Sequence, residues 1–239
     1  MKCLLRWVLA LPGVMALSAC LVTPGKFESS LDIRADRSFS FAYKGEIIAS
    51  DSGKGAMGIP EPASEDGEAA PAQLLQIAAE TFDSEADNGN DVQMRAIADA
   101  LKKEKGFRSA RYLGKRKFDI DYAISGRLTH AFLFPFNIDA QIVLPFVAVE
   151  LRGDERVRVK APGFANGFDK SQGPTLGAGG PGEEAAKALN GSFTLTTDAE
   201  IVSQNQEEGA QPAPNGKRIV WRVTPLTSEA PAATLRLQR

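Results

Sequence analysis

Three side chains near the middle of the chain have the chemistry of a hydrolytic site. Asp119 and Asp121 lie two residues apart in an alternating apolar–polar segment, so both carboxyl groups face one side of a predicted strand. Paired carboxylates carry out acid–base chemistry, and His130, the only histidine, follows them. A periplasmic hydrolase using these groups is one hypothesis. The alternation itself explains the aspartates as a solvated strand face, and no G-x-S-x-G motif accompanies the histidine.

We therefore favour a non-enzymatic chain and expect no catalytic residue. A single histidine excludes a histidine-rich zinc site and the H-E-x-x-H motif, so we also expect no metal and no cofactor. The chain carries a formal net charge of −2 and lacks the strongly basic stripe of a nucleic-acid-binding protein.

One stretch of the sequence concentrates basic residues. It is most simply the solvated end of a helix and of a hairpin, but it is also the best candidate surface for anionic lipid headgroups or an anionic envelope partner. Its members are Lys102, Lys103, Lys105, Arg108, Arg111, Lys115, Arg116 and Lys117.

The N-terminus has the pattern of a secretory signal peptide. Lys2 and Arg6 form a short basic region, and residues 7–17 form an apolar run that is too short for a permanent membrane span. The run ends in Leu17-Ser18-Ala19-Cys20, which resembles the lipobox of bacterial lipoproteins.

The lipobox resemblance implies that residues 1–19 are removed and that Cys20 becomes an acylated N-terminus anchored in a membrane. Two or more acyl chains suffice for stable anchoring. Cys3 leaves with the signal peptide, so no disulfide is expected in the mature chain. The implied location is the cell envelope, facing the periplasm. Leu21 follows the cysteine where an Asp resembles an inner-membrane retention signal, which favours the outer membrane over the inner.

Hydrophobic periodicity predicts strands on both sides of a helical segment. Residues 27–49 alternate as a β-hairpin with a turn near Ala35-Asp36-Arg37, and residues 72–83 and 91–105 have helical apolar stripes. Strands follow from residue 107, with hairpin turns at Gly114-Lys115 and Gly153-Asp154. We therefore expect an α+β fold: a mostly antiparallel sheet with one or two helices between the N-terminal hairpin and the central strands.

The most apolar stretch of the mature chain is residues 131–149. Pro135, Asn137, Asp139 and Pro145 argue against a transmembrane helix, so we expect buried strands broken by turns. This stretch also suggests an alternative function, that of a lipid-handling protein. Its apolar cavity would be lined by Phe132, Phe134, Phe136 and Phe146.

Composition divides the chain into segments. The expected organisation is a signal peptide at 1–19, a lipidated N-terminus and tether at 20–26, an α+β domain at 27–165 with an acidic loop at 50–71, a Gly/Pro-rich connector at 166–190, and a C-terminal β segment at 191–239. The last segment either completes the domain or forms a small β-unit of its own.

Several features together resemble the LppM-type lipoprotein family. They are the lipobox cysteine, the aromatic strand at 38–43, the helix leading to Gly106-Phe107, Val157-Arg158-Val159-Lys160-Ala161-Pro162-Gly163, and Ile219-Val220-Trp221-Arg222-Val223. The resemblance spans most of residues 20–237. It implies an α+β envelope domain and carries over no catalytic residue. Some members carry a C-terminal membrane helix, which we do not expect here because the sequence ends in Leu-Arg-Leu-Gln-Arg.

The function that best fits these observations is a non-enzymatic, lipid-anchored envelope protein. It would bind an envelope protein or an anionic lipid at the membrane surface, with acyl chains on Cys20 as its membrane attachment.

Overall fold

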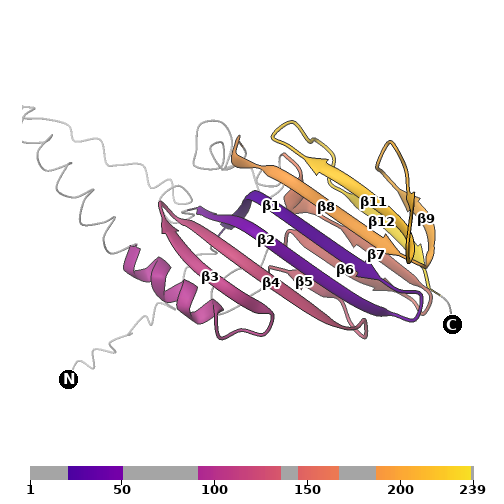
Figure 1. Cartoon of the computed structure of the whole chain (residues 1–239), viewed down its shortest axis with the longest axis horizontal. Coiled ribbons are helices and arrows are strands. Elements are labelled where there is room, and N and C mark those ends of the chain that lie inside the picture. Colours follow the sequence, from indigo (N-terminus) through magenta and orange to yellow (C-terminus); the bar gives the residue numbers. More distant parts are fainter. Residues whose placement is uncertain (1–20, 51–90, 136–144, 167–186, 238–239) are drawn as a thin grey trace, which may run out of the picture.

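The computed structural model describes residues 21–50, 91–135, 145–166 and 187–237, and most of these residues lie in β-strands. The twelve strands of this described part form a seven-stranded and a five-stranded sheet, one layered over the other (Figure 1). The expected α+β class is therefore wrong, and the fold is predominantly β. The physical reason is that the two sheets bury each other's apolar faces, which leaves only one corner for a helix to cover.

The larger sheet has the order β10-β11-β8-β1-β2-β4-β3. The β1–β2 hairpin lies at its centre, with its turn at residues 34–37 as the sequence predicted. The β1–β8 ladder is parallel and joins the N-terminal hairpin to the C-terminal segment. The strands are β1 (Leu21–Ile33), β2 (Ser38–Ser50), β3 (Phe107–Gly114), β4 (Lys117–Arg127), β8 (Asn190–Thr197), β10 (Gln211–Ala213) and β11 (Gly216–Val223).

The smaller sheet has the order β5-β6-β7-β12-β9, and all its ladders are antiparallel. A 3-10 turn, η1 (Pro162–Phe164), follows β7 and places Phe164 in the core. The strands are β5 (Phe132–Phe134), β6 (Val147–Arg152), β7 (Arg156–Lys160), β9 (Glu200–Gln204) and β12 (Ala232–Arg236).

A helix over residues 91–101 lies at the β3 end of the larger sheet (Figure 1). Met94, Ala98 and Leu101 are buried on one helical face and join the same core as both sheets. The helix stops short of the predicted residue 105, because residues 102–106 form turns that lead into β3. The predicted helix at 72–83 and most of the acidic loop at 50–71 lie outside the described residues.

Aromatic rings fill the space between the sheets. Phe41 of β2 lies 4.9 Å from Phe134 of β5, and Phe164 lies 4.3 Å from Phe27 of β1, measured between ring centroids. Burying each such ring contributes about 1.5–3 kcal/mol, so these ring contacts stabilise the packing of one sheet on the other. Tyr43 is fully buried among the same rings.

Close packing around Phe27 requires glycine on both neighbouring strands. Phe27 lies opposite Gly45 of β2 and Gly191 of β8. A β-carbon on Gly191 would lie 2.2 Å from the Phe27 carbonyl oxygen, a separation that no side chain tolerates. The parallel β1–β8 ladder therefore depends on Gly191 at this position.

Within the described residues, no helix is long and apolar enough to cross a membrane. The ends of the apolar 131–149 stretch form β5 and the start of β6, in line with the expected strands, while residues 136–144 lie outside the described part.

Candidate membrane-contact site

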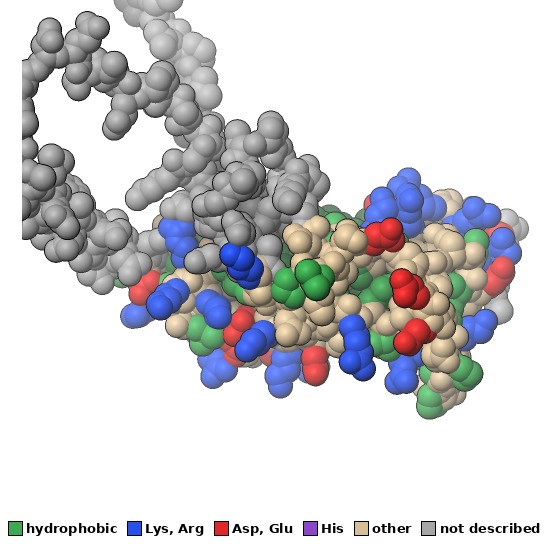
Figure 2. Space-filling view, turned by 90° about the horizontal axis from the view of Figure 1, so that it is seen from above, with side chains coloured by type: hydrophobic (Ala, Val, Ile, Leu, Met, Phe, Trp, Pro, Cys, Tyr) green, Lys and Arg blue, Asp and Glu red, His purple; other side chains and the backbone are tan. Residues whose placement is uncertain are grey.

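The basic residues concentrated in the sequence are spread along the edge strand β3. Lys102, Lys103 and Lys105 lie in the turns that precede β3, whereas Lys115 and Arg116 form the turn that follows it. The strand between them spans about 23 Å. Lys and Arg side chains are distributed over the face seen in Figure 2, with acidic side chains among them. The structure therefore divides the predicted cluster into separate groups.

Within the described residues, several of these cations lie next to carboxylates. Lys102 Nζ lies 2.9 Å from Asp99, Lys117 Nζ lies 3.3 Å from Glu46, and Arg111 pairs with Asp119. The Lys102 ammonium lowers the pKa of the Asp99 carboxyl. Exposed pairs of this kind contribute roughly 0–1 kcal/mol, but they offset charge locally and so reduce the attraction of these cations for an anionic surface.

The turn between β3 and β4 holds two basic residues in an unusual backbone conformation. Lys115 has a φ of 49° and Arg116 a φ of 57°, the left-handed values that a two-residue hairpin turn of type I′ requires. Asn and Gly are the residues preferred there, because other L-residues lose about 1–2 kcal/mol each in this region. The sequence places the turn at Gly114-Lys115, one residue earlier than the structure does.

Hydrogen bonds hold this turn in place. The Tyr112 hydroxyl accepts from the Arg116 backbone N–H at 3.2 Å and donates to the Asp91 carboxylate at the start of the described helix. The Arg116 carbonyl accepts from the Ala49 backbone N–H of β2 at 2.9 Å. The turn is therefore fixed to both the helix and the neighbouring strand.

A leucine that the sequence analysis did not single out lies beside the two cations. Leu113 falls at a β-bulge between Tyr112 and Gly114, and its side chain is 53% exposed. Bulges re-aim side chains at strand ends. The sequence could have predicted this exposure. Leu113 lies two residues after Arg111, so both side chains face the same side of β3, and that side is exposed to solvent. Leu113, Lys115 and Arg116 are called the β3–β4 tip below.

The β3–β4 tip lies at the end of the sheet where β1 begins. Val22 of β1 pairs with Ala49 of β2, and Ala49 in turn bonds to the Arg116 carbonyl. Two strand spacings, about 10 Å, thus separate the start of β1 from the turn. This end, with Leu21, Ser50 and the β3–β4 tip, is the proximal end of the sandwich. Cys20 itself lies outside the described residues.

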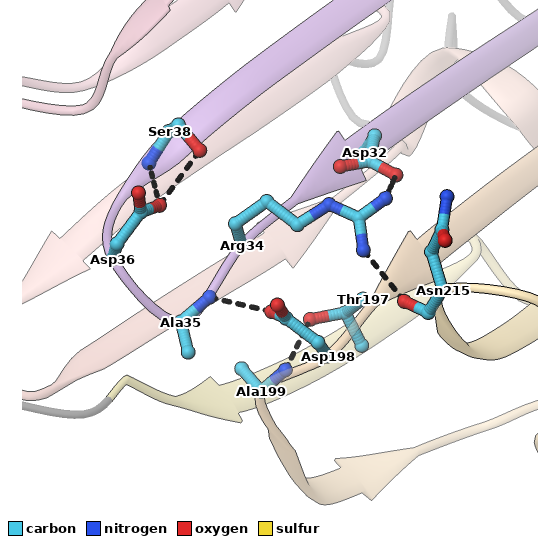
Figure 3. A network of polar contacts seen from close by, with 9 residues as sticks. All are labelled: Asp32, Arg34, Ala35, Asp36, Ser38, Thr197, Asp198, Ala199 and Asn215. Carbon is cyan, nitrogen blue, oxygen red and sulfur yellow. Dashed lines mark hydrogen bonds and ion pairs between the residues drawn. The ribbon is translucent and has the colours of Figure 1, made fainter.

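The distal end of the sandwich, about 40 Å away along β1, is closed by polar contacts between turns (Figure 3). Arg34 donates to the Asn215 carbonyl at 2.6 Å and pairs with Asp32, and the Ala35 N–H donates to Asp198 at 2.7 Å. These contacts join the β1–β2 turn to the β8–β9 and β10–β11 turns. Their polar groups are used to hold the backbone.

Two further contacts at the distal end have the same structural role. Asp36 accepts from the backbone N–H and the hydroxyl of Ser38, which lowers the pKa of the Asp36 carboxyl. The Thr197 hydroxyl accepts from the Ala199 N–H at 3.0 Å. Both are side-chain-to-backbone bonds of tight turns.

The structure does not bring the three groups of the hydrolase hypothesis together. Asp119 pairs with Arg111, and Asp121 lies opposite Lys44 of β2. His130 lies beyond the end of β4, where its Nδ1 is 3.0 Å from the Thr129 hydroxyl. The strand alone spans about 20 Å from Asp121 to its last residue, so no substrate atom can contact both groups.

The phenylalanines expected to line a lipid cavity instead pack against other rings. Phe134 and Phe146 are fully buried, and Phe134 has its ring centroid 4.7 Å from Tyr122 and 5.1 Å from Tyr43. Phe132 lies 5.1 Å from Phe41, while Phe136 is outside the described residues. The described rings thus stabilise the interior by contacting one another.

Comparison with known proteins yields distant structural likeness without a sequence match. No protein-family model matches the chain, and no curated protein matches it by sequence. Among solved structures it is similar to the NMR structure of the folded domain of Mycobacterium tuberculosis LppM. The two are 13% identical with a TM-score of 0.34, over 96% of this chain and 97% of that one. So distant a likeness supports no shared site or activity. The α+β fold that the LppM-type resemblance implied is already corrected above, and its envelope location stays a prediction.

Proposed function

We propose that this chain is an exported lipoprotein of the cell envelope, acylated at Cys20, whose β-sandwich acts at a membrane surface without a catalytic step. The lipobox-like Leu17-Ser18-Ala19-Cys20 supports the anchor. The observation that carries the proposal further is that β1 begins at Leu21, directly after the anchored residue. Residues 21–26, expected as a tether, belong to that strand.

A strand that starts at the anchor restricts where the folded part can lie. One residue spans about 3.3 Å, so the proximal end stays within a few ångströms of the acylated Cys20 and hence of the lipid headgroups. A single tethered end of this kind keeps the whole sandwich within reach of one membrane. Its partner is therefore an anionic lipid or a protein of the same envelope surface.

Charge at the proximal end favours an anionic membrane. Each Lys or Arg close to such a surface contributes about 1 kcal/mol of attraction at moderate ionic strength. Lys115 and Arg116 are both at this end. Leu21 in place of Asp after the anchor favours the outer membrane, which separation of inner and outer membranes on a density gradient tests.

Comparison of two cysteine variants tests the anchor. Cys20→Ser removes the acylated thiol, so the chain is expected to move from the membrane fraction to the aqueous fraction. Cys3→Ser is the matched control, because Cys3 belongs to the signal peptide and the variant is expected to fractionate like the wild type. Equal membrane association of Cys20→Ser and the wild type would contradict the proposal.

A further inference from the structure

We infer that the β3–β4 tip is a membrane-docking element, which inserts the Leu113 side chain among lipid headgroups and places Lys115 and Arg116 against their phosphates. This inference deepens the proposed function and rests on it. It adds an orientation: the sandwich stands on its proximal end, with its strands directed away from the bilayer.

The tip lies close to the residue that carries the anchor. The Arg116 carbonyl bonds to Ala49, whose partner on β1 is Val22, so the tip lies beside the first residues of β1. An anchor immediately before Leu21 holds the tip at headgroup level without any movement of the chain. The cations of residues 102–105 lie farther along the sheet, next to Phe107, which is level with Tyr122 and Tyr43 in the middle of the strands.

The tip combines exposed apolar and basic side chains. Leu113 is 53% exposed next to an exposed lysine, and Val92, at 69% exposed, follows Asp91, the hydrogen-bond partner of Tyr112. Apolar side chains beside basic ones at one end of a protein are typical of elements that lie in a membrane interface. A soluble anion would be bound by the cations alone and would leave Leu113 in water, so the occupant we infer is the bilayer surface.

The backbone of the turn is strained. Two consecutive non-glycine residues adopt left-handed φ values, although Asn-Gly would form the same turn without strain. Strained backbone persists where the side chains it presents have a role, and it is held here by the bonds from Ala49 and to Tyr112. The turn therefore presents the exposed Lys115 at a cost in stability, which a membrane contact explains.

The direct test places a probe on the tip. The full acylated chain, with its acyl mass confirmed, is reconstituted on vesicles of phosphatidylglycerol and phosphatidylethanolamine. Leu113→Cys carries an environment-sensitive fluorophore on its thiol. Val202→Cys is the matched control, since Val202 is a similarly exposed apolar residue, at 41%, on the edge strand β9. Emission at position 113 is expected to shift to the blue on the vesicles, and emission at position 202 is expected to stay that of water.

Neutralising the two basic residues tests their contribution separately from that of Leu113. Lys115→Gln with Arg116→Gln is expected to lower the ratio of inserted to water-exposed probe about fivefold per cation, roughly 30-fold together, on anionic vesicles. Lys217→Gln with Arg218→Gln is the matched control: it removes an exposed Lys-Arg pair at the distal end and is expected to leave the ratio unchanged. Millimolar inorganic phosphate in the buffer is expected to have no effect beyond its ionic strength.

The outcomes separate this inference from the proposed function. Water-like emission at position 113 on a chain that carries acyl groups would overturn the docking inference and leave the anchor intact. Equal loss of insertion in both charge variants, or displacement of the tip by phosphate at constant ionic strength, would also overturn it. A purified chain without acyl groups would overturn both.

Discussion

Replacing the two residues of the β3–β4 turn by those that the turn geometry prefers should stabilise the protein and weaken its membrane contact. In Lys115→Asn with Arg116→Gly, both positions keep their left-handed φ values of 49° and 57°. Relief of strain is worth about 1–2 kcal/mol per residue, and the extra freedom of glycine in the unfolded chain offsets about 0.5–1 kcal/mol. With two residues relieved, the expected net gain in unfolding free energy is therefore about 1–3.5 kcal/mol.

Urea unfolding of the acylated chain in detergent measures this gain. Trp221 is the only tryptophan after the predicted signal peptide, and it is buried, with its ring stacked on Phe193 and its indole N–H bonded to Asn205. Its fluorescence therefore reports unfolding of the sandwich. A gain of this size raises the unfolding midpoint without changing the denaturant slope.

A charge-only variant separates strain from electrostatics. Lys115→Gln keeps the strained backbone and removes only an exposed charge, so its unfolding free energy should stay within about 0.5 kcal/mol of the wild type. Both variants should weaken the preference of the tip for anionic vesicles. An unchanged or lower stability of the Asn-Gly variant would refute the idea that this turn keeps its cations at a cost.

Two further predictions concern the core. Phe41→Ala, which removes a ring that is 1% exposed and lies among Phe132 and Phe134, should lower the unfolding free energy by about 3–5 kcal/mol, as measured by urea unfolding. Burial raises the pKa of the Tyr43 phenol well above its usual value, and the nearby Glu46 charge adds to this. The neutral phenol therefore contributes stability that is fully present below about pH 10 and is lost as the pH rises further. Tyr43→Phe loses the hydrogen bond to the Glu46 carbonyl, about 1 kcal/mol at neutral pH, but should lose less stability than the wild type as the pH is raised past 10. A wild type and a Tyr43→Phe variant with parallel stability–pH curves would contradict this reasoning.

The alternation of apolar and polar residues predicted the local hairpins, because a hairpin depends only on two neighbouring strands and the turn residues between them. The β1–β2 turn and the β6–β7 turn at Gly153 lie where the sequence placed them. The pairing of β1 with β8 was not predictable in this way, because it joins residues far apart in the chain through a parallel ladder. The smaller sheet likewise depends on β12, from the end of the chain, pairing with both β7 and β9. Local patterns do not show such pairings, which is why the α+β class was wrong.

At the candidate site, too, the sequence predicted the residue types but not the contacts between residues that are far apart in the chain. The sequence identified the basic residues, including Lys115 and Arg116, from their types alone. It did not reveal that Lys102, Arg111 and Lys117 have carboxylate partners. Nor did it place the β3–β4 turn beside Leu21, since that neighbourhood arises only when β4 pairs with β2 and β2 pairs with β1.

The intact mass of the protein extracted from membranes tests the central claim most directly. The anchored lipoprotein should have the mass of a chain that begins at Cys20 plus two or more acyl chains, and treatment that cleaves acyl esters should remove part of that added mass. The proximal end is then held at the headgroups by covalent chemistry. A chain that begins at another residue, or one that begins at Cys20 with no added mass, would contradict the account.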